Sequence, residues 1–158
     1  MIANEILVKY PKIYDGEFCT IYDMRQEIPH TSLAFWKGFF RIESPAFQKD
    51  MKYSLNFIRE KNIKAIISDH SLLKVVTPDV LAWLHANWYA VAAKNGLKIE
   101  ASLEPQDIFA KATLGKMLEA NKISNIHALK FGSFEDAYTY SAELAKKMWI
   151  LSALQQKI

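Results

Sequence analysis

Asp69, His70 and Ser71 are three consecutive residues whose side chains could take part in acid–base or nucleophilic chemistry. A hydrolase triad uses these three residue types, but adjacent residues cannot point at one another in triad geometry. The sequence also lacks the G-x-S-x-G elbow that presents the serine of α/β hydrolases. We interpret the three residues as a polar strand end and loop. Asp69 remains a candidate ligand-site residue, because α/β folds bind ligands at the carboxyl ends of parallel strands.

Metal and cofactor motifs are absent from the sequence. The four histidines, His30, His70, His85 and His127, do not pair at helical ligand spacing, and Cys19 is not at ligand spacing from any of them. Cys19 falls within an apolar run and is expected to behave as a small buried hydrophobe. The five glycines are isolated, which excludes a glycine-rich phosphate loop. We predict no catalytic residue, no metal and no cofactor.

Composition favours one ordinary globular domain over residues 1–158. The chain has 51% hydrophobic and 23% charged residues, which is enough apolar material for a core without disulfides or metal. Its 20 basic and 17 acidic residues are interspersed, and the net charge of +3 forms no basic stripe, so nucleic-acid binding is not expected. No apolar run reaches the ~18 residues of a membrane span, so we expect no stable membrane insertion. The N-terminus lacks a signal-peptide pattern, and the expected location is the cytoplasm.

Hydrophobic periodicity and turn residues predict an α/β fold. Ser44-Pro45 and Thr77-Pro78-Asp79 each combine a cap residue with a proline suited to a first helical turn. Early strands separated by turn signals predict antiparallel hairpins, and later strands alternating with helices predict parallel strands with right-handed βαβ crossovers. The result is a mixed sheet flanked by about four helices. The predicted strands cover residues 5–10, 18–24, 32–36, 64–68, 97–103 and 125–130, and the helices 45–61, 77–95, 106 to about 117, and 133 onward.

Aromatic residues mark a candidate interface or pocket. Trp83 and Trp88 lie on one predicted helix, with Tyr89 beside the second. A spacing of five residues turns the two indoles roughly 140° apart on an α-helix. One can therefore pack in the core while the other lies at a helix flank, an interface or a pocket mouth. Core packing of all three is the simpler alternative.

The C-terminal segment 149–158 is apolar on more than one side of its predicted helix. Trp149 begins this tail and is the fourth candidate interface residue. A helix that is apolar all round must be covered by something. The cover is either the same domain or a second copy, and we expect a homodimer. The tail lacks the basic face of an interfacial membrane helix.

An ordered set of short segments resembles bacterial SpoIIAA-like proteins of the STAS/SEC14 type, over nearly the whole chain. The resemblance implies a mixed sheet flanked by helices and a regulatory role. Members that antagonise anti-sigma factors carry a phosphorylated serine in an Asp-Ser-Ser-Gly-type turn. The comparable junction here, Thr77-Pro78-Asp79, has neither the serine nor the glycine, and a capping role would occupy the Thr77 hydroxyl. The matching segments are Phe35-Trp36-Lys37-Gly38, Ile66-Ile67-Ser68-Asp69, Thr77-Pro78-Asp79 with Trp83, Ala101, Pro105, Phe131 and Phe134-Glu135-Asp136-Ala137.

Three functions follow from these observations. The first is a non-enzymatic STAS-like regulatory or protein-interaction module of unknown partner, with Asp69, Thr77 and Asp79 as its candidate regulatory or ligand site. It predicts an exposed apolar patch near Trp88 or the tail. The second is a binder of a lipid or other small apolar ligand, which predicts an internal apolar cavity with a few polar groups at its mouth. The third is an enzyme, which predicts titratable residues converging in a cleft, for example Asp69, His70 and Asp79.

Overall fold

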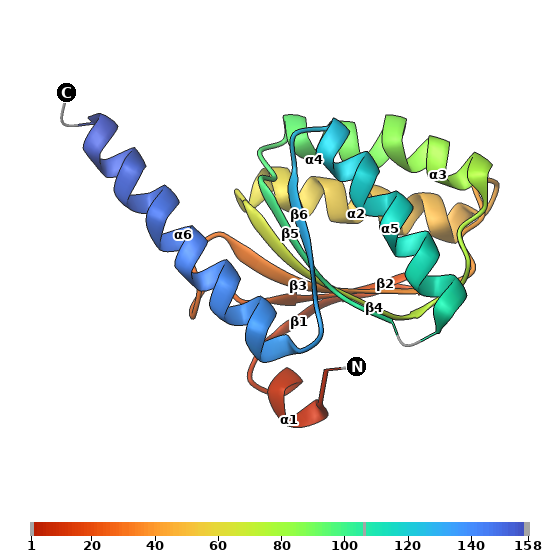
Figure 1. Cartoon of the computed structure of the whole chain (residues 1–158), viewed down its shortest axis with the longest axis horizontal. Coiled ribbons are helices and arrows are strands. Elements are labelled where there is room, and N and C mark those ends of the chain that lie inside the picture. Colours follow the sequence, from red (N-terminus) through yellow and green to blue (C-terminus); the bar gives the residue numbers. More distant parts are fainter. Residues whose placement is uncertain (1, 106, 157–158) are drawn as a thin grey trace.

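The computed structural model describes residues 2–105 and 107–156, which form one six-stranded mixed sheet with helices on both faces (Figure 1). The strands lie in the sheet in chain order, from β1 to β6. β1, β2 and β3 pair antiparallel, and β3 to β6 pair parallel. The predicted α/β fold with front hairpins and βαβ crossovers is therefore confirmed. The strands are β1 Lys12–Asp15, β2 Cys19–Asp23, β3 Thr31–Gly38, β4 Ala65–Leu73, β5 Ile99–Leu103 and β6 His127–Phe131.

The helices form two layers. Each crossover between parallel strands moves one strand further in the same direction, so right-handed connections place all the crossover helices on one face of the sheet. Figure 1 shows α2 to α5 on that face and α6 with the short α1 away from it. α3, η1 and α4 are consecutive segments of one helical stretch. The helices are α1 Asn4–Leu7, α2 Pro45–Glu60, α3 Pro78–Leu84, the π-helical turn η1 His85–Tyr89, α4 Ala90–Lys94, α5 Ile108–Ile123 and α6 Phe134–Gln156.

Side chains of β4 alternate between two separate hydrophobic cores. Ile66 points into the larger core, beneath α2 to α5, whereas Ile67 points into the smaller core, against α1 and α6. All six residues of β4 from Ala65 to His70 are buried. β4 is therefore covered on both faces, as expected for a parallel strand within an α/β sheet.

Two of the predicted helix starts have the expected cap, and one does not. Ser44 Oγ accepts a hydrogen bond from Phe47 N, and Ser133 Oγ accepts one from Asp136 N. Thr77 occupies the cap position of α3 but makes no side-chain cap bond. Its hydroxyl instead donates to the Asp79 carboxylate. The expectation that capping occupies the Thr77 hydroxyl is therefore wrong, since a nearby acceptor takes it.

The predicted strand at residues 5–10 is also wrong. Asn4–Leu7 forms the helix α1, and the first strand begins after Pro11. A short apolar run does not distinguish a strand from one turn of helix, and tertiary packing decides. Here Ile6, Leu7 and Tyr10 pack against the smaller core. Among the described residues, no helix has the length and apolar character needed to cross a membrane.

Asp50 of α2 fixes the front hairpin to the helical layer. Its side chain is buried and accepts hydrogen bonds from Phe18 N at 2.7 Å and from the Tyr14 hydroxyl at 2.5 Å. A Cβ at Gly16 would collide with this carboxylate. The absence of a side chain at Gly16 is thus a condition for bringing the β1–β2 turn against α2.

Replacement of Asp50 by alanine should destabilise the fold by about 2–4 kcal/mol, because it leaves the buried Phe18 N–H without a partner and removes a charge-assisted bond. Urea denaturation of Asp50→Ala beside Asp79→Ala, an exposed carboxylate, measures the difference in unfolding free energy. Equal stability of the two variants would contradict this role for Asp50.

Candidate functional site

A row of polar side chains lies inside the larger core. Ser68 and His70 of β4 and Glu100 and Ser102 of β5 are each no more than 2% exposed. The register pairs Ser68 with Ser102 and Ile66 with Glu100, so the four residues are neighbours on one face of the sheet. The Ser68 hydroxyl accepts from Trp36 Nε1 at 3.0 Å, and the Ser102 hydroxyl donates to Glu100 at 3.3 Å.

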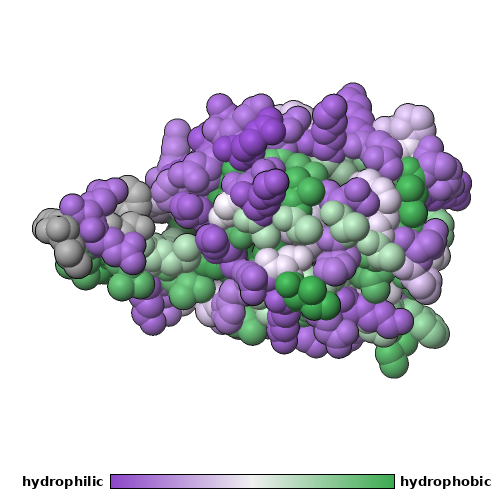
Figure 2. Space-filling model, turned by 90° about the horizontal axis from the view of Figure 1, so that it is seen from above, coloured by the Kyte–Doolittle hydropathy of each residue, from purple (hydrophilic) through white to green (hydrophobic). Residues whose placement is uncertain are grey.

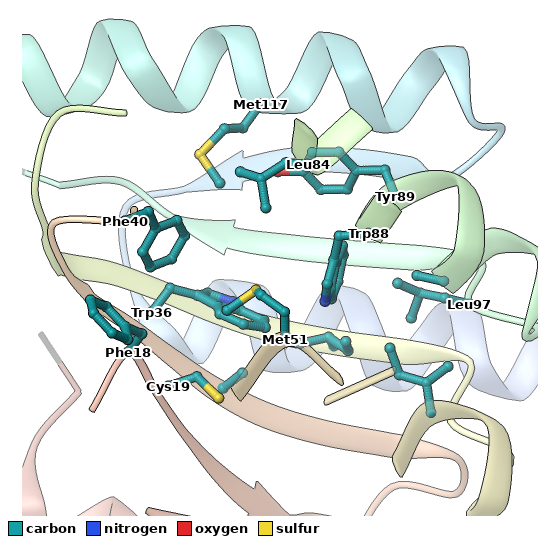
Figure 3. Packing of buried hydrophobic residues seen from close by; sticks show 14 of the residues in the cluster. Phe18, Cys19, Trp36, Phe40, Met51, Leu84, Trp88, Tyr89, Leu97 and Met117 are labelled. Carbon is teal, nitrogen blue, oxygen red and sulfur yellow. The ribbon is translucent and has the colours of Figure 1, made fainter. Parts of the chain in front are cut away.

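An internal cavity of about 20 Å³ lies between this row and the helices. Trp36 and Trp88 meet edge to face at one side of it, and Met117 and Leu84 lie across from them (Figure 3). The volume suffices for one water molecule. All its lining residues are buried: Trp36, Phe40, Met51, His70, Leu84, Trp88, Tyr89, Glu100 and Met117.

His70 stands at an irregularity between β3 and β4. Phe35 pairs with Asp69 but Lys37 pairs with Leu72, so β4 contains one more residue than β3 over this stretch. Such bulges redirect side chains. Neither ring nitrogen of His70 has a hydrogen-bond partner among the residues that the structure describes. Burial lowers the pKa of His70 to about 4, although the Asp69 carboxylate opposes the shift. The imidazole is therefore neutral at pH 7.

Glu100 is a buried acid with no basic partner among the cavity residues. Burial raises the pKa of Glu100 to about 7, against the opposing effects of the Ser102 hydroxyl and the Asn121 amide. The Asn121 side chain, on α5, makes no hydrogen bond of normal geometry through either its nitrogen or its oxygen. Glu100 also contributes to the raised pKa of Tyr89, behind burial as the main cause. Near neutral pH, Glu100 can therefore bind or release a proton.

The two titratable groups do not form an acid–base pair. Glu100 pairs with Ile66, four residues before His70 on β4. At about 3.3 Å per residue, this offset separates their Cα atoms by roughly 13 Å along the strands. The two side chains therefore border different parts of the cavity. Glu100 and His70 can each bind a proton independently, but they cannot act together as an acid and a base on one substrate atom.

The predicted regulatory or ligand site is not assembled as one cluster. Asp69 points to the opposite face of the sheet from His70 and accepts from Ile2 N at 3.1 Å and Ser71 N at 2.8 Å. These two hydrogen bonds tie the Asp69 carboxylate to the N-terminal segment and to the bulge in β4. Thr77 and Asp79 bond each other at the start of α3, where Asp79 is exposed. Of the three titratable residues suggested for a cleft, Asp69, His70 and Asp79, only His70 borders the cavity.

The three aromatic candidates all contact the larger core, but they are buried to different extents. Trp88 and Tyr89 are buried and border the cavity, whereas Trp83 is partly buried and packs on Phe47. The π-helical turn η1 has more residues per turn than an α-helix and changes the facing of the residues that follow. Trp88 Nε1 donates to Ser54 Oγ at 2.9 Å, so its polar edge is satisfied inside the core.

The C-terminal part of α6 is the second candidate site. Figure 1 shows this part extending past the sheet, and Figure 2 shows apolar residues along the projecting end. Ile150, Leu151 and Leu154 are 56%, 59% and 54% exposed. Trp149 lies within α6, but its side chain is outside what the structure describes, as are residues 157 and 158.

Two hollows flank this helix. One, of about 480 Å³, lies between α6 and the starting ends of β4 and β5, with Ala65, Ile99, Ala145, Met148 and Leu151 among its lining. The other, of about 530 Å³, lies between α6 and the loop at Ile28 and Pro29 and includes Ala142, Ala145 and Ile150. Both fall within the size range of ligand pockets. In each hollow the small side chain of Ala145 shares the lining with a larger side chain of α6, Met148 in the first hollow and Ile150 in the second.

Sequence reasoning missed Glu100 and Asn121, and placed Cys19 correctly. Along Leu97 to Leu103, Glu100 alternates with apolar residues together with Lys98 and Ser102, a pattern typical of a solvent-facing side of a strand that gave no signal for a buried acid. Asn121 gave no signal, since it lies among the ordinary polar residues of a helix. Cys19 is buried, and burial raises the pKa of its thiol, which makes it a poor nucleophile.

Comparisons with protein-family models, with curated proteins and with solved structures give no match to this chain. Among the described residues, no group of three or more His, Cys, Asp or Glu side chains is placed to hold a metal ion.

His70 and Glu100 should contribute to stability with opposite pH dependence. Glu100 has a raised pKa, so its contribution is present below pH 4.5 and is lost as the pH rises to about 7. His70 has a lowered pKa, so its contribution is present above pH 6.5 and is lost as the pH falls to about 4. Each amounts to about 3 kcal/mol, and the two nearly cancel in the unmodified chain.

Single substitutions separate the two contributions. Glu100→Gln should become less stable as the pH falls below 6.5, whereas His70→Leu should become less stable as the pH rises above 4.5. Urea denaturation across this range measures both profiles, and the other titratable groups contribute equally to each. Parallel profiles in the two variants would show that the buried groups do not control the pH dependence.

Proposed function

We propose that this chain is a non-enzymatic, STAS-like regulatory or protein-interaction module that acts as a homodimer in the cytoplasm. The observation that carries the proposal is the apolar projecting end of α6. A helix of 23 residues is about 35 Å long, and its last turns extend beyond the sheet that covers its first turns. Exposed apolar area of this kind favours association.

A second copy is the partner that fits this surface. Each molecule offers both a ridge, formed by Ile150, Leu151 and Leu154, and hollows beside the same helix. A two-fold axis between two α6 helices places the ridge of each copy in a hollow of the other, so that the same surface of both copies forms the interface. The small residues Ala142 and Ala145 leave room for large side chains of an approaching helix.

The buried cavity also favours a non-enzymatic role. His70 and Glu100 are buried and separated along the sheet, so a substrate would have to open the core to reach them. The STAS-like assignment is supported by the mixed sheet and by the resemblance of ordered segments.

Binding of an apolar ligand is the second candidate. The internal cavity, at about 20 Å³, is far too small for a lipid, whereas the hollow of about 480 Å³ beside α6 is large enough for a small apolar molecule. Such a ligand would contact Met148 and Leu151. It would therefore compete with the second copy for the same helix.

Leu151→Asp should raise the dissociation constant of the homodimer at least tenfold, because a charge would be buried in place of an apolar contact. Leu151 is largely exposed in the single chain, so the fold should be unaffected. Analytical ultracentrifugation gives the constant, and native mass spectrometry reports any retained small molecule.

Ile123→Asp is the matched control, since Ile123 is 69% exposed at the end of α5. It should leave the dimer intact. A monomeric unmodified chain, or an equal effect of the two substitutions, would refute the α6 homodimer. A retained apolar molecule that is lost in Leu151→Asp would instead support the ligand-binding candidate.

A further inference from the structure

The π-helical turn η1 interrupts an otherwise α-helical stretch directly above the buried acid. π-turns are rare and occur often at functional sites. η1 places Trp88 and Tyr89, two consecutive aromatic residues, in the core together. They meet edge to face at 5.2 Å between ring centroids, and both border the cavity that Glu100 lines.

Among the described residues that line the cavity with Glu100, none carries a positive charge that could compensate its ionisation, and β6 places the uncharged Ala128 beside it. Tyr89 faces it from η1, Asn121 from α5 and Ser102 from its own strand. His70 of β4 borders the same cavity and is neutral at pH 7. α2 contributes Met51, which is not titratable. An ionised carboxylate here has the hydrogen bond from Ser102 but no partner of opposite charge among the cavity residues, and this is costly in a buried site.

We propose that Glu100 is a proton-binding site that controls the packing of η1 on the sheet. With its proton, the carboxyl group remains beneath the π-turn and Tyr89 covers it. Without the proton, the carboxylate is stabilised by water, and η1 opens to admit it. η1 is the covering segment with its own outer surface in solvent, since Ala86 and Asn87 are exposed.

The pH window follows from the proton affinities of the closed and open states. The closed state holds the proton up to about pH 7, whereas an opened, hydrated Glu100 would lose it near 4.5. Opening should therefore increase roughly tenfold per pH unit between these values and level off above pH 7. This proposal concerns the core of each chain and does not depend on pairing through α6.

Hydrogen exchange of the η1 amides, corrected for the intrinsic pH dependence of exchange, measures this opening. The opening constant in the unmodified chain should rise with pH as described. Glu100→Gln should lose this rise with pH over the same range. Glu104→Gln, which removes a carboxylate that is exposed and pairs with Lys130 at the end of the same strand, should behave like the unmodified chain.

Two further measurements isolate the effect of the Glu100 proton on η1. Opening of η1 would also expose the neutral His70, whose protonation at low pH favours the open state and so opposes the effect of Glu100. His70→Leu removes this opposing contribution, and the dependence on Glu100 should persist in that variant. NMR of ¹³C-labelled carboxyl groups in the unmodified chain should show a glutamate titrating near pH 7 that is missing from Glu100→Gln. A Glu100 signal that titrates near 4.5, or an unchanged pH dependence of η1 exchange in Glu100→Gln, would overturn the proposal.

Discussion

Burial of β4 on both faces is the constraint on which the rest of the structure depends. Six consecutive residues from Ala65 to His70 are removed from water, and three of them are polar. A buried polar group must find a partner or destabilise the fold. Ser68 finds one in Trp36 on the adjacent strand, and Asp69 finds two, in Ile2 and in the bulge that follows it. The N-terminal segment is thus held in place by a residue of the central strand.

The exceptions to this rule define the candidate site. Within the described part of the chain, the His70 and Asn121 side chains have no hydrogen-bond partner of normal geometry, and no positive charge lines the cavity beside Glu100. All three lie on the face of the sheet beneath the crossover helices, where Trp36, Trp88 and Tyr89 occupy most of the space. A core packed only for stability would replace such groups with apolar residues of similar volume, which are often neutral or stabilising. The placement of His70 and Glu100 at one small cavity is the reason to assign them a role.

The fold followed from the sequence wherever the signals were local. Ser44-Pro45 begins α2 as predicted, and strands alternating with helices produced the parallel half of the sheet. Failures arose where tertiary contacts or irregular backbone decide. Residues 5–10 form no strand because the smaller core accepts them as a helix and turn, and the π-turn His85–Tyr89 cannot be recognised from a hydrophobic period of 3.6. The candidate site was out of reach for a similar reason, since it combines β4, β5 and α5.

The order of the strands has a consequence for how the chain folds. Each strand pairs with the one before it in the sequence, so the sheet can grow from its first hairpin by one βα unit at a time. Contacts between elements near in sequence require little loop-closure entropy and favour rapid folding. The face that carries Leu33, Phe35 and Ile67 is covered last, because α6 follows all six strands in the chain. During synthesis this apolar face stays open until α6 leaves the ribosome, which makes the nascent chain most prone to aggregate just before that helix emerges.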